Sequence, residues 1–183
     1  MAIDEKLPFV SINIAVMTVS DTRTIANDTS GATLAERLTA AGHKLADHAI
    51  VKDDVSLITA KLTQWIDDPN VDCIITNGGT GVTGRDVTPE AFRQVWEKEI
   101  PGFGEYFRWI SMKHIGSSTI QSRATAGVAN GTYLFALPGS PGAVKDGWDE
   151  ILKFQLDSRH RPCNFVELMP RLTEHVKAAK KKG

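Results

Sequence analysis

The stretch VDCIITNGGTGVTGRDVTPEAF, residues 71–92, decides the fold because it joins a strand to a glycine loop and then to a helix. Residues 71–76 form a short continuous apolar run, typical of a strand buried inside a sheet. Four glycines follow between positions 78 and 84. Thr88 and Pro89 then predict a helix that Thr88 caps and Pro89 begins.

The rest of the chain alternates predicted strands with amphipathic helices, which implies an α/β fold with a mostly parallel sheet and helices on both faces. Strands are predicted over residues 9–21, 43–51 and 132–137. Four buried helical stripes are predicted: Leu34, Leu38 and Ala41; Ile58, Leu62, Trp65 and Ile66; Phe103, Phe107 and Ile110; and Val144, Trp148, Ile151 and Leu152.

Helix starts and irregular segments complete this interpretation. Asp28, Thr29 and Ser30 each offer a cap for the first helix, and Ser56 is predicted to cap the second. Residues 117–131 are polar and small, and no element is assigned to them. Residues 157–172 are expected to be irregular.

Composition limits the kinds of partner. The chain has 183 residues, which suits one domain, and residues 171–183 are expected to form a flexible basic tail. With 21 basic and 22 acidic residues, no global charge favours nucleic acid or a membrane surface. Two cysteines fit a reducing compartment, and the charged start MAIDEKLPF lacks the apolar core of a signal peptide. A cytoplasmic location is therefore expected.

The glycine loop contains a misleading dinucleotide-binding motif. Gly79, Gly81 and Gly84 match G-x-G-x-x-G after a strand, but the predicted helix begins too late for its N-terminus to meet a pyrophosphate. No strand ends in an acidic residue at the required distance downstream. The Gly-Lys-Ser/Thr of a Walker loop is also missing.

The same loop has the chemistry of an anion site. Its glycines expose backbone N–H groups, Arg85 suits phosphate, and Asp86 would repel phosphate unless a cation such as Mg²⁺ lay between them. The alternative is a tight turn with a surface Arg85–Asp86 ion pair. The glycines together with Arg-Asp and Thr-Pro-Glu favour the anion site.

Other kinds of chemistry have weaker support. The histidines and cysteines lack the spacing of a zinc site, and Ser122 has no Gly-x-Ser-x-Gly elbow around it. Because ligands of open α/β sheets bind beyond the carboxyl ends of the strands, three loops are expected to meet there. These are Ser20–Asp21, the glycine loop, and the segment LPGSPG at residues 137–142.

Seven motifs carry a resemblance to a known family. They are VMTVSD, DTSGATLAERLTAAGH, IVKDD, TNGGTGVTGRDVTPEA, GFGEYFR, STIQSRATAGVANGTYLFALPGSPGAV and QLDSRHRPCNF. In this order they resemble molybdenum cofactor biosynthesis proteins of the MoaB/MogA type, and the last favours the MoaB branch. The resemblance spans nearly the whole chain.

The resemblance implies a three-layer α/β/α molybdopterin-binding fold, here a single domain over residues 1–170, assembled as a homotrimer or homohexamer. It implies adenylyl transfer from Mg-ATP to the terminal phosphate of molybdopterin, with release of pyrophosphate. ATP and molybdopterin would be substrates, Mg²⁺ the cofactor, and the molybdate-insertion protein of the pathway a partner. The alternative is a non-catalytic molybdopterin-binding or assembly protein with the same fold.

The resemblance also implies site residues. Asp86 matches the acidic residue on which catalysis rests, and Asp53 the second one, although Asp54 could take that role instead; the two carboxylates would hold Mg²⁺. Ser140 stands where relatives have Asn, which weakens the match of the last loop. The residues expected to bind substrate or nucleotide are Ser20, Asp21, Gly78, Gly79, Thr80, Gly81, Arg85, Thr88, Ser122, Arg123, Pro138, Gly139 and Ser140.

Overall fold

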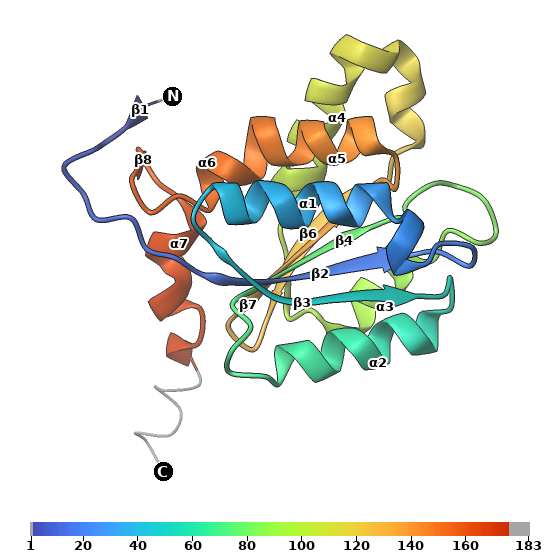
Figure 1. Ribbon diagram of the computed structural model, residues 1–183, viewed down its shortest axis with the longest axis horizontal. Coiled ribbons are helices and arrows are strands. Elements are labelled where there is room, and N and C mark those ends of the chain that lie inside the picture. The colour runs from blue at the N-terminus through green and yellow to red at the C-terminus, as the bar shows by residue number, and fades with distance from the viewer. Residues whose placement is uncertain (1, 176–183) are drawn as a thin grey trace.

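A central sheet has six strands in the order β3-β2-β4-β7-β6-β5 within residues 2–175, the part of the chain that the computed structural model describes (Figure 1). Neighbouring strands from β3 to β7 are parallel, whereas β6 pairs antiparallel with both β7 and β5. The predicted mostly parallel sheet is therefore confirmed. The strands span Asn13–Val19 (β2), Lys44–Val51 (β3), Cys73–Asn77 (β4), Lys98–Glu99 (β5), Thr125–Ala129 (β6) and Thr132–Leu137 (β7).

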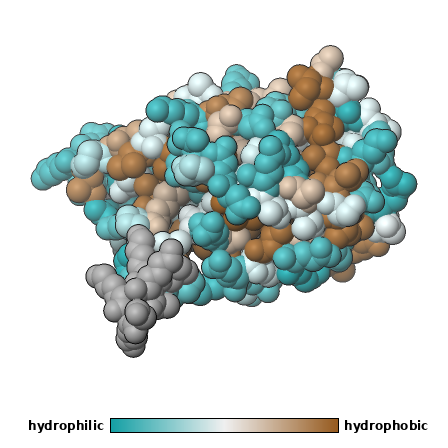
Figure 2. All heavy atoms as spheres, turned by 90° about the horizontal axis from the view of Figure 1, so that it is seen from below, coloured by the Kyte–Doolittle hydropathy of each residue, from teal (hydrophilic) through white to brown (hydrophobic). Residues whose placement is uncertain are grey.

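Helices cover both faces of the sheet and make a three-layer α/β/α architecture. Helices α1, α4, α5 and α6 lie over one face, and α2 and α3 over the other (Figure 1). Their bounds are Thr29–Ala40 (α1), Val55–Ile66 (α2), Thr88–Val95 (α3), Pro101–Ile115 (α4), Pro141–Gly147 (α5) and Lys153–Gln155 (α6). Figure 2 views the molecule from the α2 side, where hydrophilic residues cover most of the surface around a band of hydrophobic ones.

Apolar side chains of β2 pack against the helices on both faces of the sheet, because successive side chains of a strand point to opposite faces. Ile14 and Val16 are buried in a cluster that includes Leu34 of α1. Met17 is buried in a second cluster that includes Ile58 of α2. A one-residue slip would therefore exchange the two layers.

The first two helices begin at aspartates. Asp28 caps α1, where its Oδ1 accepts a hydrogen bond from the Gly31 N–H at 2.9 Å. Asp54 caps α2 by accepting from the N–H groups of Ser56 and Leu57 at 2.9 and 3.0 Å. The prediction that Ser56 caps α2 was wrong, because the aspartate two residues earlier reaches those free N–H groups first.

The third helix also begins one residue earlier than predicted. Val87 occupies the cap position of α3 and Thr88 is its first residue. The Thr88 hydroxyl instead donates to the carbonyl of Gly78 at 2.9 Å. The predicted capping role of Thr88 was wrong because its side chain ties the helix to the glycine loop.

Residues 117–131, to which no element was assigned, contain part of a 3-10 helix, Gly116–Gln121 (η2), and the whole of β6. Strands β6 and β7 form a hairpin that turns at Asn130 and Gly131, whose φ values are 45° and 87°. Two consecutive positive φ values match the tight turn that favours Asn-Gly. The hairpin reverses β6 relative to the rest of the sheet.

Two predicted strands differ from the observed ones. The first is shorter than residues 9–21, since β2 begins at Asn13 and ends at Val19. β3 lies at the edge of the sheet, and its residues are exposed or half-buried without alternation. An edge strand has a neighbour on one side only, which leaves much of it open to solvent.

The C-terminal part contains short elements. Between α5 and α6 lies a π-helical turn, Trp148–Leu152 (η3), and the predicted stripe from Val144 to Leu152 is buried. Residues 157–172 contain a strand, a helix and a 3-10 turn: His160–Arg161 (β8), Phe165–Leu168 (α7) and Met169–Arg171 (η4). Strand β8 pairs with Ala2–Ile3 (β1).

The basic tail predicted over residues 171–183 lies largely outside the described residues, which end at 175, so its flexibility stays a prediction. Within residues 2–175, no helix combines the length and the apolar character needed to cross a membrane.

Candidate functional site

The carboxyl ends of four parallel strands place the predicted loops at one edge of the sheet. β2 leads into Ser20–Asp21, β3 into Lys52–Asp53, β4 into the glycine loop, and β7 into residues 138–140. Gly78 hydrogen bonds through its N–H to the carbonyl of Leu137 at 3.0 Å, which ties the glycine loop to the end of β7. The expected meeting of these loops is confirmed.

Two glycines shape the loop because no other residue fits their positions. Gly78 and Gly79 have φ values of 97° and 62°. A Cβ on Gly78 would lie 2.2 Å from the carbonyl oxygen of Val19, and one on Gly79 would lie 2.5 Å from Thr88 Oγ1. The loop therefore packs directly against the end of β2 and the start of α3.

Gly139 brings the third loop into the same packing, since a Cβ placed on it would lie 3.1 Å from the Cα of Gly78. The Ser30 hydroxyl donates to the Gly139 carbonyl at 2.8 Å and anchors that loop to α1. Ser140 caps α5 by accepting from the Ala143 N–H at 3.2 Å. Ser140 thus has a structural contact within its own loop.

Asp86 is fixed as an ionised carboxylate beside the loop. Its Oδ2 accepts from the backbone N–H and the hydroxyl of Thr83, at 2.9 and 2.6 Å. Partial burial alone would raise the pKa of Asp86, but the hydrogen bonds from Thr83 and Gly81 and the charge of Arg123 outweigh it and lower the pKa. A Cβ on Gly81 would lie 2.8 Å from Asp86 Oδ2, so this carboxylate lines the loop directly.

Asp53 faces the same loop with the opposite pKa shift. Its Oδ1 lies 3.3 Å from the place where a Cβ on Gly79 would be. Partial burial, and then the charge of Asp86, raise the pKa of Asp53. Asp54 is exposed and caps α2, so Asp53 is the acidic residue that faces the glycine loop.

Two arginines have contacts that the sequence did not reveal. Arg123 donates from Nε to the carbonyl of Gly81 and from Nη2 to the carbonyl of Asp86, each at 2.6 Å, and pairs with Glu90. It therefore holds the loop from the segment just before β6. Arg85 pairs with Asp21, so this cation links the glycine loop to the loop after β2.

The remaining predicted residues divide between the loop and its surroundings. Thr80 is buried, and its carbonyl accepts from the Arg123 N–H at 2.8 Å. Ser20 Oγ accepts from the N–H groups of Thr22 and Arg23 at 3.2 Å. Ser122 lines a separate groove beside α4.

A buried polar network lies behind the loop and was missed by the sequence analysis. The Thr18 hydroxyl donates to Asp28 at 2.6 Å, and Asn77 Nδ2 donates to Thr18 Oγ1 at 2.8 Å. His48 Nε2 lies 3.1 Å from the same Asp28 oxygen. Asp28 therefore joins the start of α1 to β2 and β3, and Thr18 extends the network to β4. Thr83 was also missed, although a threonine three residues before an aspartate is a common local hydrogen-bonding pattern.

Acidic side chains at the loop suit a hard divalent cation, although the described residues contain no group of three or more His, Cys, Asp or Glu side chains able to hold a metal. Mg²⁺ commonly binds through one or two carboxylates together with substrate phosphates. Asp53 and Asp86 could act as such a pair. Burial and then the charge of Asp86 raise the pKa of Asp53, and a cation between the two carboxylates would relieve their repulsion.

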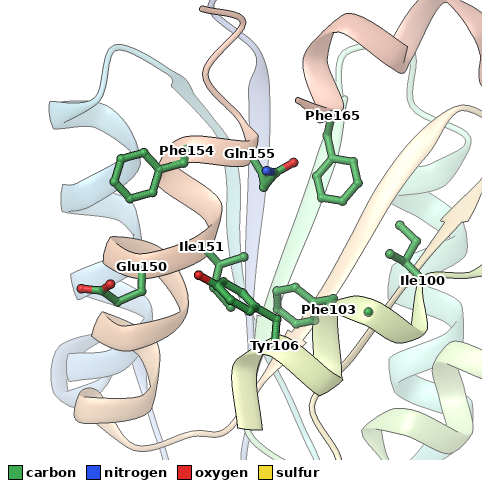
Figure 3. Close-up of a pocket in the computed structure, with 9 residues that line it drawn as sticks. Ile100, Phe103, Tyr106, Glu150, Ile151, Phe154, Gln155 and Phe165 are labelled. Carbon is green, nitrogen blue, oxygen red and sulfur yellow. The ribbon is translucent and has the colours of Figure 1, made fainter. Parts of the chain in front are cut away.

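An apolar groove of about 380 Å³ lies away from the loop, between α4 and the helical run formed by η3 and α6 (Figure 3). Its walls include Phe103, Tyr106, Ile151 and Phe165. The groove lacks the cluster of polar groups found at the loop, so we assign the chemistry to the glycine loop.

The fold and the glycine site together define a class of protein. Residues 15–158 match the family model described as "Probable molybdopterin binding domain". The chain belongs to this family, the molybdenum cofactor biosynthesis proteins of the MoaB and MogA type.

Individual relatives make the likeness more specific. The chain is 46% identical over 157 residues to molybdenum cofactor biosynthesis protein B of Escherichia coli K12, covering 86% of this chain and 92% of that protein. A crystal structure of a molybdenum cofactor biosynthesis protein B has a TM-score of 0.81 at 39% identity, covering 90% of this chain and 98% of that one. The tungsten cofactor synthesizing protein MoaB from Pyrococcus furiosus has a TM-score of 0.70 at 35% identity, covering 78% and 91%.

Proposed function

We propose that this molybdenum cofactor biosynthesis protein transfers the adenylyl group of Mg-ATP to the terminal phosphate of molybdopterin. The observation that carries the proposal is the pair of carboxylates, Asp53 and Asp86, beside a glycine loop that cannot accept side chains at Gly78 and Gly79. Such a loop offers backbone N–H groups to phosphate oxygens.

The reaction needs positioning and charge neutralisation more than a general base. An oxygen of the molybdopterin phosphate attacks the α-phosphorus of ATP, the bond from that phosphorus to the bridging oxygen breaks, and pyrophosphate leaves with the electron pair. The attacking phosphate is already ionised near neutral pH. The protein's part is to bring two polyanions into line.

Asp53 and Asp86 would hold Mg²⁺ in this proposal. When bound, the ion would supply charge neutralisation between the acidic pair and the phosphates. Asp86 is held by Thr83 in its ionised form, whereas Asp53 is the carboxylate whose proton affinity a cation would lower. Arg123 keeps Gly81 and Asp86 in place through their carbonyl groups.

Mass detection of adenylyl-molybdopterin after incubation with molybdopterin and Mg-ATP tests the proposal. Wild-type protein should form the product, and Asp86→Asn should not, although it folds and still binds molybdopterin. If wild-type protein binds molybdopterin and never yields the adenylylated product, the proposed adenylyl transfer is contradicted. That result would favour a non-catalytic binding or assembly protein.

We further propose that the protein works in the cytoplasm as a homotrimer or homohexamer and passes its product to the molybdate-insertion protein. The support for self-association is the exposed apolar face of α4, which presents Tyr106, Trp109, Met112 and Ile115. The Tyr106 and Trp109 rings stack at 5.6 Å, and Tyr106 also lines the apolar groove. Trp109→Glu should lower the mass measured by sedimentation.

A further inference from the structure

A polar groove of about 450 Å³ opens between the loop after β2 and the end of β3. Its walls include two cationic side chains, Arg23 and Lys52, one carboxylate, Asp21, and the polar side chains of Ser20, Thr24 and His48. Ser20 and Arg23 also line a smaller hollow of about 120 Å³ that reaches Asn77 and Gly139. The groove therefore leads from the edge strand toward the loops after β4 and β7.

Two cations in this groove have no carboxylate partner in the described part of the chain. Neither Arg23 nor Lys52 takes part in the ion pairs found within residues 2–175. Both residues are exposed, and Arg23 donates from Nη1 to the Asn27 carbonyl at 3.2 Å. Their charges are thus available to a ligand.

The carboxylate that lines the groove, Asp21, and the one that lines the smaller hollow, Asp28, already have partners. Asp21 pairs with Arg85. Asp28 is buried and accepts hydrogen bonds from Thr18 and Gly31, and it lies 3.1 Å from His48 Nε2. The groove therefore presents positive charge that its own carboxylates do not neutralise, which favours an anionic ligand.

The groove and the proposed reaction site share neighbouring residues of the chain. Lys52 directly precedes Asp53, whose Oδ1 lies 3.3 Å from the Cβ position of Gly79. The Ser20 N–H donates to the Val51 carbonyl at 2.8 Å, which holds the ends of β2 and β3 together. A polyphosphate with one phosphorus at the glycine loop would thus extend toward Lys52 and Arg23.

We propose that Arg23 and Lys52 bind the β- and γ-phosphates of the nucleotide and hold pyrophosphate as it leaves. This inference rests on the proposed adenylyl transfer and adds the direction in which the triphosphate lies. When the α-phosphorus bonds to the molybdopterin phosphate, its bond to the bridging oxygen breaks, and pyrophosphate carries the extra negative charge. A planar guanidinium and an ammonium group suit the several oxygens of that anion.

Calorimetric titration of inorganic pyrophosphate into the purified protein, with and without Mg²⁺, tests the site directly. Wild-type protein should bind, and Lys52→Gln and Arg23→Gln should each weaken binding by about tenfold or more. Lys44→Gln is the matched control, because Lys44 lies at the opposite end of β3 from Lys52 and its neutralisation should leave the affinity unchanged. Both test residues are exposed, so the variants should keep the wild-type melting temperature.

Two results would overturn the site: pyrophosphate affinity unaltered by both substitutions in either condition, or an equal loss in Lys44→Gln. If the two variants lose pyrophosphate binding and the wild-type protein forms no adenylyl-molybdopterin, the anion site is supported and the proposed reaction is contradicted. If both variants form the product with the same KM for ATP as wild type, the reaction is supported and this site is contradicted.

Discussion

Asp53 and Asp86 face two glycines of one loop and have opposite pKa shifts. The carboxylate of Asp53 lies 3.3 Å from the Cβ position of Gly79, and that of Asp86 lies 2.8 Å from the Cβ position of Gly81. Hydrogen bonds from Thr83 keep Asp86 ionised, and its charge adds to burial in raising the pKa of Asp53. This arrangement places two acidic side chains beside the glycine loop, where the proposed divalent cation would relieve their repulsion.

Asp53→Asn should lower the rate of adenylyl transfer by about 100-fold or more, as loss of a well-placed electrostatic group does. The neighbouring Asp54→Asn is the control. Asp54 caps α2, and asparagine caps helices as well as aspartate does, so this variant should keep both rate and stability. Equal loss of rate in the two variants, measured by product formation under initial-rate conditions, would contradict the assignment of Asp53.

The raised pKa of Asp53 predicts a pH-dependent stability. The ionised form is less favourable in the folded chain than in the unfolded one, so wild type should lose stability as the pH rises through the folded pKa of Asp53. Asp53→Asn should therefore be more stable than wild type at neutral pH. The difference should vanish below the ordinary carboxyl range, at about pH 3. Urea unfolding at several pH values measures it.

Magnesium ions should stabilise the protein by relieving the repulsion between these two carboxylates. If Asp53 and Asp86 share a cation, adding Mg²⁺ should raise the melting temperature of wild type and leave that of Asp53→Asn unchanged. An equal rise in both proteins would place the ion elsewhere.

Gly79→Ala should lower the free energy of unfolding by at least about 2 kcal/mol, because its φ of 62° is unfavourable for alanine and the new Cβ would meet Thr88 Oγ1. Gly84 lies in the same loop, and a Cβ there has nothing within 4 Å. Gly84→Ala should therefore change stability by no more than about 0.5 kcal/mol. Denaturant unfolding of the two variants compares them directly, and equal effects would count against the loop geometry.

Arg123→Met should destabilise the protein by about 2 kcal/mol, because it removes donors from the carbonyls of Gly81 and Asp86 and leaves Glu90 without this partner. Arg93 also pairs with Glu90, but from an exposed position on α3. Arg93→Met should cost less than about 1 kcal/mol. A larger loss in Arg93→Met would show that Arg123 does not hold the loop.

The layers of the fold were predictable because hydrophobic periodicity reports burial along each element. β4 is buried throughout, and the stripe of α2 at Ile58, Leu62 and Trp65 faces the core as its spacing indicates. The β6–β7 hairpin was not predicted, although Asn130-Gly131 between two runs of small or apolar residues is a strong turn signal. It was missed because three of the five residues of β6 are alanine or glycine, which are depleted in strands.

The site was predictable only where one segment carries its own chemistry. The glycine loop and Asp86 lie within a few residues of each other, so their proximity is local. Arg123 reaches Gly81 from 42 residues away along the chain, and no spacing rule links the two. The Asp54 carboxylate, by contrast, is committed by local hydrogen bonds from Ser56 and Leu57, and this commitment distinguishes it from Asp53.

The most direct measurement of the central claim is the mass of the pterin product formed by wild-type protein and by Asp86→Asn, each given molybdopterin and Mg-ATP. The account predicts adenylyl-molybdopterin from wild type and none from a folded Asp86→Asn that still binds molybdopterin. Equal product from both proteins, or none from a wild type that binds molybdopterin, would contradict it.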